Sequence, residues 1–265
     1  MEWLDIDADV IRHVINRLYD RGIKTQRLNT YITAIKKCAE KAWNMGLISD
    51  HTLFEIKEIK GERGYQIVRS RPLNTDEVDQ LFAQSVTENY SKNTLIRDNA
   101  MLAIMLGCGL RRAEMLALSF DSFFKKQDRW WLRVTGKGNK ERQIPINNRR
   151  WVHVERWLKL RAQYTSHPTD DCIWLRITKN GHVLSAPISD TSSVYRVVTK
   201  RFKMSFGRLE HASPHDLRRT VATLLYKAEV DIGVIQDLLG HANISTTYTY
   251  ITKEDSVLVS AIDAL

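Results

Sequence analysis

The sequence Ser-Pro-His-Asp-Leu-Arg-Arg, residues 213–219, carries the clearest helix start in the chain. Ser213 is placed as the N-cap, Pro214 as the first helical residue, and Asp216 as the acid of a capping box. The apolar residues that should face the core recur at helical spacing: Leu217, Val221, Leu224 and Ala228. This pattern predicts an amphipathic helix with its apolar stripe in the core.

Two cationic side chains, His215 and Arg218, lie three residues apart on this helix and share a stripe apart from the apolar one. Arginine can grip two oxygens of a phosphate, and histidine can donate a hydrogen bond or a proton. A helix N-terminus also favours an anion. Short polar pairs on helices are usually solvated, so this pair predicts an anion site only together with further motifs.

The composition is that of a globular protein with an excess of positive charge. Of the 265 residues, 43% are hydrophobic and 27% are charged, and the formal net charge is +9. This length predicts one large domain, or a large and a small one, with enough residues for a packed core. The positive charge favours a polyanionic partner, and nucleic acid is the first candidate.

The sequence carries neither targeting signals nor a cysteine framework. No apolar run has the length of a membrane span, and the acidic start is unlike a secretory or transit peptide. A cytoplasmic location and no membrane partner are therefore expected. Cys38, Cys108 and Cys172 are widely spaced in apolar surroundings, which favours reduced core thiols over disulfides or a zinc site.

The N-terminal part predicts a helical hairpin over residues 7–21 and 24–45. The apolar positions expected to face inward are Val10, Val14 and Leu18, then Leu28, Ile32, Ile35, Ala39 and Trp43. The second helix also carries a row of basic residues, namely Lys24, Arg27, Lys36, Lys37 and Lys41. This row is either a solvated face or a DNA-facing one. Residues 60–71 have no sustained periodicity and predict a linker.

A new domain begins after this linker, where Asn74 and Glu77 form a second capping box and Leu73 and Val78 a hydrophobic staple. Helices are predicted over residues 76–84, 95–106, 111–118, 151–164 and 190–206. Residues 130–134 and 143–146 flank a glycine-rich turn and predict a β-hairpin whose lysines, Lys140 included, point outward. Residues 172–175 are a candidate short strand.

The C-terminal part is rich in boundary signals. Asp231 is placed to cap a helix through Leu239, Gly240 to end it in the left-handed conformation, and Ser245 to cap a last short helix. Residues 257–265 carry an apolar stripe that either folds back on its own domain or docks on a neighbouring subunit. The predicted fold class is mainly α with a small β-hairpin (α+β).

Five motifs stand in a fixed order: GLRRAE at 109–114, GKGNKER at 136–142, HDLR at 215–218, LLGH at 238–241 and STTYTY at 245–250. Together they resemble the tyrosine recombinase (phage integrase) family, and the chain is similar to Xer-like and mobile-element integrases. Each motif is weak alone, but five in the correct order make chance agreement implausible. The resemblance implies a helical core-binding domain followed by a catalytic domain.

The resemblance implies a role for each matched residue. Arg111 and Arg218 would clamp the scissile phosphate, and Glu114, which matches the family's acid three residues after the first arginine, would be a supporting partner that orients the site. Lys137 would protonate the leaving 5′ oxygen, and His215 and His241 would complete the pocket by hydrogen bonding and proton handling. Tyr250 would be the nucleophile that forms a 3′-phosphotyrosine. Two arginines and histidine donors aimed at the phosphoryl oxygens can replace metal ions, so no metal and no cofactor are expected.

Helix geometry distinguishes the two neighbouring tyrosines. Tyr248 and Tyr250 are two residues apart and point roughly 200° apart on a helix, so both cannot face one pocket. Spacing from His241 favours Tyr250, and Tyr248 is expected to be a packed aromatic. Arg112 and Arg219 stand beside the proposed catalytic arginines and are expected to point elsewhere.

The expected organisation is a core-binding domain over residues 1–66 and a catalytic domain with a C-terminal tail over residues 67–265. The segment before Asp7 is short for this family, so one interpretation is an N-terminal truncation. The resemblance implies duplex DNA as substrate, a homotetramer on DNA, and accessory DNA-bending or directionality proteins as further partners. A type IB topoisomerase and a non-catalytic DNA-binding protein on the same fold are the alternatives.

Overall fold

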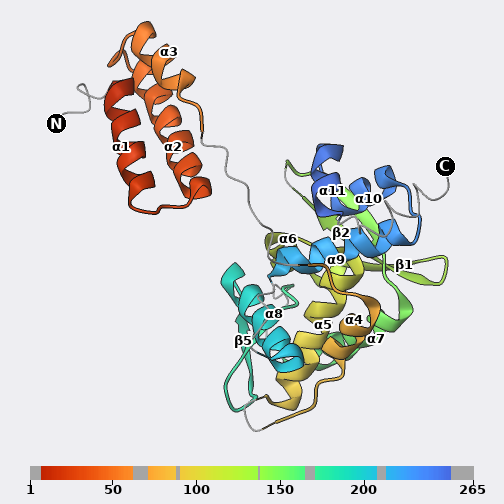
Figure 1. The fold of residues 1–265 in the computed structure, drawn as a ribbon. Helices are drawn as coiled ribbons and strands as arrows, with labels where there is room; N and C mark the ends of the chain where they lie inside the picture. The colour runs from red at the N-terminus through yellow and green to blue at the C-terminus, as the bar shows by residue number, and fades with distance from the viewer. Residues whose placement is uncertain are drawn as a thin grey trace. The chain divides into compact units, whose positions relative to one another are not determined.

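The computed structural model describes residues 7–61, 71–87, 90–136, 138–164, 171–207 and 213–251. The chain divides into two compact units, residues 1–68 and 69–265, each with its own hydrophobic core (Figure 1). Most of the expected linker and the apolar C-terminal stripe lie outside the described residues. Within the described ranges, no helix combines the length and the hydropathy needed to cross a membrane.

Unit 1 consists of α1 (Ala8–Asp20), α2 (Thr25–Asn44) and α3 (Asp50–Glu58). The predicted hairpin of α1 and α2 is confirmed, but α3 was not predicted. Its start has an ordinary signal: Ser49 is the N-cap, and its hydroxyl accepts the amide hydrogen of Thr52 at 3.1 Å.

The buried face of α1 differs from the predicted one. Ile11 and Ile15 are buried, whereas Val14 is 45% exposed, because α1 packs against α3 as well as α2. On α2 the prediction is better, since Leu28, Ile32 and Ala39 are buried. Trp43 is an exception: it is exposed, and its indole N–H donates to the carboxylate of Asp50 at 2.5 Å.

Unit 2 is built around α5 (Lys92–Cys108), whose residues 100–105 are all buried. α5 packs against α7 (Asn148–Ala162) and α9 (Pro214–Lys227). The other helices are α4 (Thr75–Phe82), α6 (Arg112–Leu116), α8 (Thr191–Phe206), α10 (Ile232–Leu239) and α11 (Ile244–Tyr250). A mainly helical fold with little β-structure is therefore confirmed.

Two small antiparallel sheets complete unit 2. The first has the order β1 (Phe123–Lys126), β2 (Arg129–Thr135) and β3 (Glu141–Pro145), preceded by a 3-10 turn over Phe120–Ser122. Leu132 on β2 pairs with Phe123 and Ile144, and all three side chains are buried. The second sheet joins β4 (Leu175–Ile177) to β5 (Val183–Pro187). The strand expected over residues 172–175 is thus misplaced, since Cys172 forms only an isolated bridge with Ser119.

The helix caps follow the local sequence, with one correction. Ser213 and Asp216 form the predicted capping box of α9, and Gly240 ends α10 in the left-handed conformation, with φ +65°. The N-cap of α11, however, is Asn243 and not Ser245. The Asn243 side chain accepts the amide hydrogen of Ser245 at 2.9 Å, which moves the helix start upstream.

Two expectations of burial are wrong. Ala228 is the C-cap of α9 and is exposed, because the helix ends one residue before the last position of its apolar stripe. Cys38 is exposed on α2, whereas Cys108 is buried and Cys172 is half-buried. All three cysteines are free thiols.

Candidate active site

Arg111 lies at the joint between α5 and α6. Gly109 ends α5 in the left-handed conformation, with φ +62°, which glycine adopts without strain. Arg111 is the N-cap of α6, and Glu114 accepts its amide hydrogen at 2.9 Å in a capping box. Glu114 also accepts from the Arg111 guanidinium at 2.8 Å. The backbone turn and the ion pair together fix this arginine.

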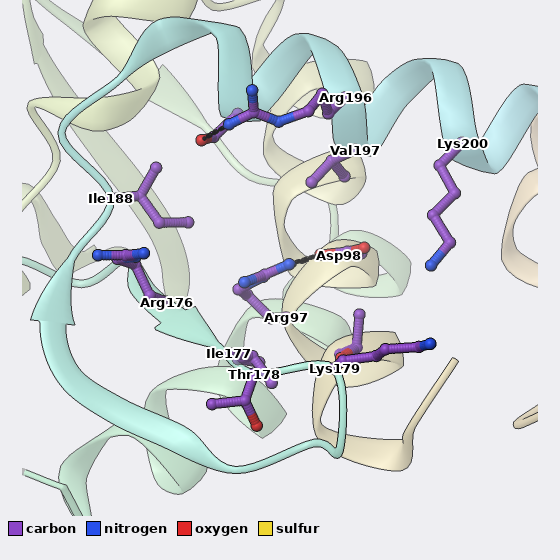
Figure 2. A pocket seen from close by; sticks show the side chains of 12 residues that line it. Arg97, Asp98, Arg176, Ile177, Thr178, Lys179, Ile188, Arg196, Val197 and Lys200 are labelled. Atoms are coloured by element: carbon purple, nitrogen blue, oxygen red, sulfur yellow. Dashed lines mark hydrogen bonds and ion pairs between the residues drawn. The ribbon is translucent and has the colours of Figure 1, made fainter. Parts of the chain in front are cut away.

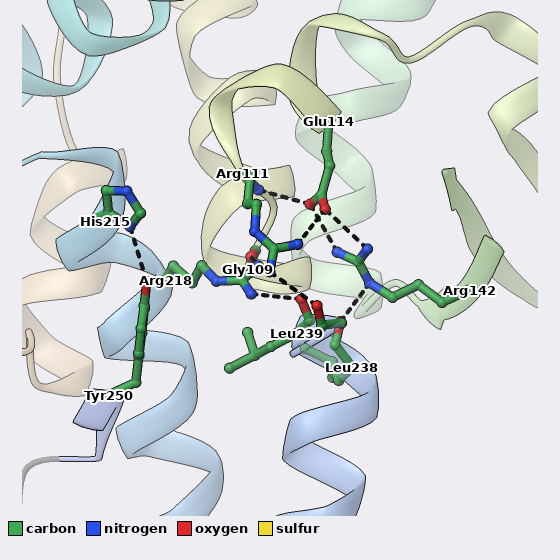
Figure 3. A network of polar contacts seen from close by, with 10 residues as sticks. Gly109, Arg111, Glu114, Arg142, His215, Arg218, Leu238, Leu239 and Tyr250 are labelled. Atoms are coloured by element: carbon green, nitrogen blue, oxygen red, sulfur yellow. Dashed lines mark hydrogen bonds and ion pairs between the residues drawn. The ribbon is translucent and has the colours of Figure 1, made fainter. Parts of the chain in front are cut away.

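Glu114 is buried, and two guanidiniums share its carboxylate (Figure 3). Arg142 on β3 donates to Oε2 at 2.9 Å and to Oε1 at 3.2 Å. Burial alone would raise the pKa of Glu114, but hydrogen bonds from Arg142 and Arg111 outweigh it and lower this pKa to about 2. Glu114 is therefore ionised at neutral pH. Sequence reasoning missed Arg142, although it is the last residue of the GKGNKER motif.

Arg218 lines the same cavity as His215, but it is a core residue, although the sequence predicted a stripe apart from the apolar one. It is only 1% exposed, and it donates to the carbonyls of Gly109 at 2.7 Å and Leu239 at 2.6 Å. Its buried Nε has no hydrogen-bond partner within the described part of the chain. Burial and the nearby Arg111 lower the pKa of this guanidinium to about 10, so it remains charged.

The side chain of Tyr250, the last residue of α11, points toward the start of α9 (Figure 3). Its hydroxyl lies 3.1 Å from Nδ1 of His215, and its ring centroid lies 5.0 Å from that of His241. His241 is buried and shares a 2.9 Å hydrogen bond with Thr247 through Nδ1. Tyr248 is 49% exposed and is not the packed aromatic that was expected.

Both histidines are held in the neutral form at pH 7. Burial is the main cause of the lowered pKa of His215, and the charges of Arg112 and Arg218 add to it. Burial, Arg218 and Arg111 lower the pKa of His241 to about 4. A neutral imidazole can accept a proton, so His215 is poised to do so from the hydroxyl beside it.

A cavity of about 270 Å³ lies against Arg111, His215 and Arg218. It is lined by Leu110, Arg111, Arg112, Ala113, Thr191, Pro214, His215 and Arg218. Arg112 was expected to point elsewhere, but it lines the same cavity as Arg111. Three guanidiniums and a histidine around one small space make it suited to an oxyanion.

Comparison with known proteins decides the family. Residues 71–256 match the model described as "Phage integrase family". The chain belongs to this family. Tyrosine recombinase XerC of Proteus mirabilis is 29% identical over 268 residues, which cover 99% of this chain and 80% of that protein. XerC of Escherichia coli O157:H7 is 31% identical over 267 residues, covering 99% and 81%.

Solved structures share the fold of this tyrosine recombinase. The site-specific recombinase XerH, bound to its difH substrate before cleavage, aligns with a TM-score of 0.69 at 20% identity over 98% of this chain and 71% of its own. A lambda integrase dimer bound to a COC′ core site aligns with a TM-score of 0.65 at 18% identity, over 95% and 82%. These comparisons favour a site-specific recombinase over a topoisomerase or a non-catalytic DNA-binding protein.

The hairpin of the recombinase is described on both sides of Lys137, but Lys137 itself lies outside the described residues. The amide of Gly136 donates to the carbonyl of Lys140 at 2.8 Å and closes the turn. Gly138 has φ +76°, and Asn139 also has positive φ. Lys140 is exposed, as predicted.

A second cavity, of about 300 Å³, lies between α5, β4 and α8 (Figure 2). Its charged lining residues are Arg97, Asp98, Arg176, Lys179, Arg196 and Lys200. Arg97 is paired with Asp98 at 2.8 Å, but Arg176 and Lys179 are exposed and no partner is found for them within the described ranges. This cavity is therefore strongly cationic, and sequence reasoning did not identify it.

The basic row of α2 separates into two groups. Lys24, Arg27, Lys37 and Lys41 are exposed. At about 100° per residue they fall on one side of the helix, and Lys36 lies roughly opposite Arg27. Lys36 instead donates to the backbone carbonyl of Lys57 in α3 at 2.6 Å. Four of the five basic residues therefore share a solvent-facing surface.

Proposed function

We propose that this recombinase cuts and rejoins duplex DNA with Tyr250 as the nucleophile, through a 3′-phosphotyrosine intermediate. One observation carries the proposal: the Tyr250 hydroxyl lies 3.1 Å from His215 Nδ1, and His215 lines one cavity with Arg111 and Arg218. A phosphodiester in that cavity would lie against two guanidiniums and a proton acceptor, with the Tyr250 hydroxyl beside that acceptor.

In the proposed cleavage step, Tyr250 Oη forms a bond to phosphorus while the bond from phosphorus to the 5′ oxygen breaks. The phenolic proton passes to His215, and the leaving 5′ oxygen takes a proton from Lys137, a role that rests on the motif alone. The phosphotyrosine conserves the bond energy, so a second 5′ hydroxyl can reverse the reaction without ATP.

Arg111 and Arg218 stabilise the charge that develops on the non-bridging oxygens. The unpartnered Nε of Arg218 supports this role, because a buried N–H without an acceptor is costly unless a ligand supplies one. We assign His241 to the pocket as a neutral group beside the Tyr250 ring, oriented by Thr247.

The experiment that tests this function traps the covalent intermediate. The full chain is incubated with duplex fragments from the DNA that flanks its gene, denatured in detergent, and digested so that the DNA-linked peptide can be mapped by mass spectrometry. We expect the adduct on Tyr250. An adduct on another residue, or tight salt-sensitive binding with no adduct, would count against the proposal.

The rate of adduct formation should rise with pH and level off below the ordinary range of histidine. His215 must be neutral to accept the proton of Tyr250, and its pKa lies below 6.5, so activity is lost only as the pH falls through that lowered value. Single-turnover rates between about pH 4.5 and 8 measure this rise of the rate with pH. His215→Gln should react slowly at every pH and show no such rise. A midpoint of the rise above pH 6.5 in the parent would contradict the role of His215.

We propose that the DNA backbone runs from the active-site cavity along α8 to the second, cationic cavity. Thr191, at the start of α8, lines the first cavity, and Lys200 lines the second. These residues lie about 13 Å apart along the helix, a distance that one duplex easily spans. Phosphate contacts at both places would supply affinity without reading sequence.

Removal of the exposed charges of Arg176 and Lys179 in the second cavity should weaken DNA binding and reduce the dependence of that binding on salt. For Arg176→Ala/Lys179→Ala we expect a slope of log K against log salt that is shallower by about 2, and roughly tenfold weaker binding at moderate salt. The control pair Lys159→Ala/Lys203→Ala removes two exposed charges of α7 and α8 that do not line this cavity. Equal slopes for the two double variants would rule out the proposed path.

We further propose that residues 1–66 form the core-binding domain and contact DNA through Lys24, Arg27, Lys37 and Lys41. Their shared exposed side supports this role. Exchange of strands between two duplexes requires four cleavages, so we propose a homotetramer on DNA, to which accessory DNA-bending or directionality proteins can add.

A further inference from the structure

Three arginines from three different elements converge on the C-terminal end of α10 (Figure 3). Arg142 comes from β3, Arg218 from α9, and Arg111 from the start of α6. Each donates to a different carbonyl: Arg142 Nε to Leu238 at 2.8 Å, Arg218 Nη2 to Leu239 at 2.6 Å, and Arg111 Nη2 to Gly240 at 3.0 Å. Consecutive carbonyls of one helix end therefore fix all three guanidiniums.

The end of a helix suits this task for two physical reasons. Its last carbonyls have no intrahelical partner, and they carry the negative end of the helix dipole. Here the amides of Gly240 and His241 already satisfy the carbonyls of Gln236 and Asp237, which leaves the next three carbonyls for side chains. Their partial charges offset part of the repulsion between the arginines.

Arg142 binds α10 and α6 at the same time. Its side chain is only 13% exposed, with Nε on the Leu238 carbonyl and both terminal nitrogens on Glu114. The approach to α10 is close: a Cβ on Gly240 would lie 3.0 Å from Arg142 Nη1 and 3.2 Å from Cζ. Glycine at position 240 thus leaves room for this guanidinium in addition to allowing the positive φ.

Arg142 does not line the active-site cavity within the described part of the chain, whereas its neighbour Arg111 does. Both arginines bind the same carboxylate, so Glu114 links Arg142 directly to an arginine that lines the cavity. We propose that Arg142 is a positioning residue, which holds Glu114 and, through it, Arg111 in the orientation that strand cleavage requires. This inference rests on the proposed function.

Without Arg142, the carboxylate of Glu114 would be held from one side only. Glu114 would keep its ion pair with Arg111 but could rotate, and the Leu238 carbonyl would lose the hydrogen bond from Arg142. Ground-state binding of DNA depends on many phosphate contacts, whereas cleavage depends on the position of Arg111. The loss should therefore fall on the rate of cleavage and not on affinity.

The first test compares Arg142→Met, Arg142→Lys and the control Arg133→Met. Arg133 is on the adjacent strand and pairs with Glu141 at 3.3 Å, away from the cavity. At saturating DNA, Arg142→Met should form the adduct about 10- to 100-fold more slowly, with a dissociation constant within about twofold of the parent. Arg142→Lys should recover only part of the rate, because lysine keeps the charge but cannot bind the carboxylate of Glu114 through two nitrogens of one planar group. Arg133→Met should match the parent.

The pH dependence gives a readout that a purely structural role would not change. Among the residues that the structure describes, the charged or titratable groups that face Glu114 are Arg111 on α6, Arg142 from β3, Arg218 from α9 and His241 after α10. Without Arg142 the pKa of Glu114 rises, and its protonated form cannot hold Arg111. Arg142→Met should therefore add the protonation of Glu114 to that of His215, so that its activity falls more steeply with decreasing pH than the activity of the parent. If this variant does not fold, the same change is sought in Arg142→Lys.

A double-mutant cycle with Glu114→Gln settles whether Arg142 acts through Glu114. We expect the double variant to be far faster than the product of the two single losses predicts. Fully additive losses, or parent rates in a folded Arg142→Met, would overturn the inference. Absence of any adduct from the parent chain would instead show that the proposed function itself has failed.

Discussion

Tyr250→Phe should abolish the covalent protein–DNA adduct, by at least about 10⁴-fold, while DNA binding stays within about twofold of the parent. The substitution removes a single heavy atom, the attacking oxygen. The 3.1 Å hydrogen bond between this oxygen and His215 is lost with it, and such a bond contributes about 1 kcal/mol or less to stability. Adduct yield on denaturing gels and DNA affinity by fluorescence anisotropy check the two parts.

Tyr248→Phe is the matched control, since it makes the same change two residues earlier on the same helix. The Tyr248 side chain is 49% exposed, and no contact places its hydroxyl at the described site. We expect parent-like adduct formation. A Tyr250→Phe variant that still forms the adduct, or a Tyr248→Phe variant that does not, would show that Tyr250 is not the nucleophile or not the only tyrosine that cleavage requires.

Arg218→Ala should slow cleavage by about 10³-fold at saturating DNA, the second-largest effect expected. Arg218 is buried and fixed by the Gly109 and Leu239 carbonyls, so its guanidinium needs no reorganisation as charge develops on the phosphate. Arg218→Lys keeps the charge but cannot reproduce two bonds from one planar group, and about 10²-fold is expected. Single-turnover kinetics measure both losses.

Thermal unfolding separates the loss of chemistry from the loss of fold in these variants. Arg219→Ala is the control, because it removes the neighbouring guanidinium, which does not line the cavity. Its cleavage rate should stay within a few-fold of the parent. The assignment of Arg218 fails if Arg218→Ala is folded and cleaves at a parent-like rate, or if Arg219→Ala is equally slow.

The parts of the fold that were predicted correctly depend on neighbours in the sequence. Ser213 and Asp216 form their capping box through atoms three residues apart, and Gly240 reverses the chain by its own conformational freedom. The separation of Tyr248 from Tyr250 follows from helix rotation alone. Such features require no knowledge of tertiary packing, and the motif order was enough to indicate the family.

The errors arose where a side chain's surroundings come from distant segments. Val14 was predicted to face inward, but Ile15 is buried in its place, because helical spacing alone allows either face and only packing against α3 selects one. Arg112 was expected to point away from the site because its neighbour Arg111 was assigned there, but both arginines line the cavity.

The sequence by itself indicated the family, most of the helices and the residue types for phosphoryl transfer, because short-range signals and motif order carry that information. Only the tertiary structure decided that Arg218 is buried, that Arg142 shares Glu114 with Arg111, and that the end of α10 binds all three arginines. Those partners lie as many as 129 residues apart. A guanidinium on a helix or strand has no preferred partner until the fold brings a carbonyl or a carboxylate within hydrogen-bonding distance.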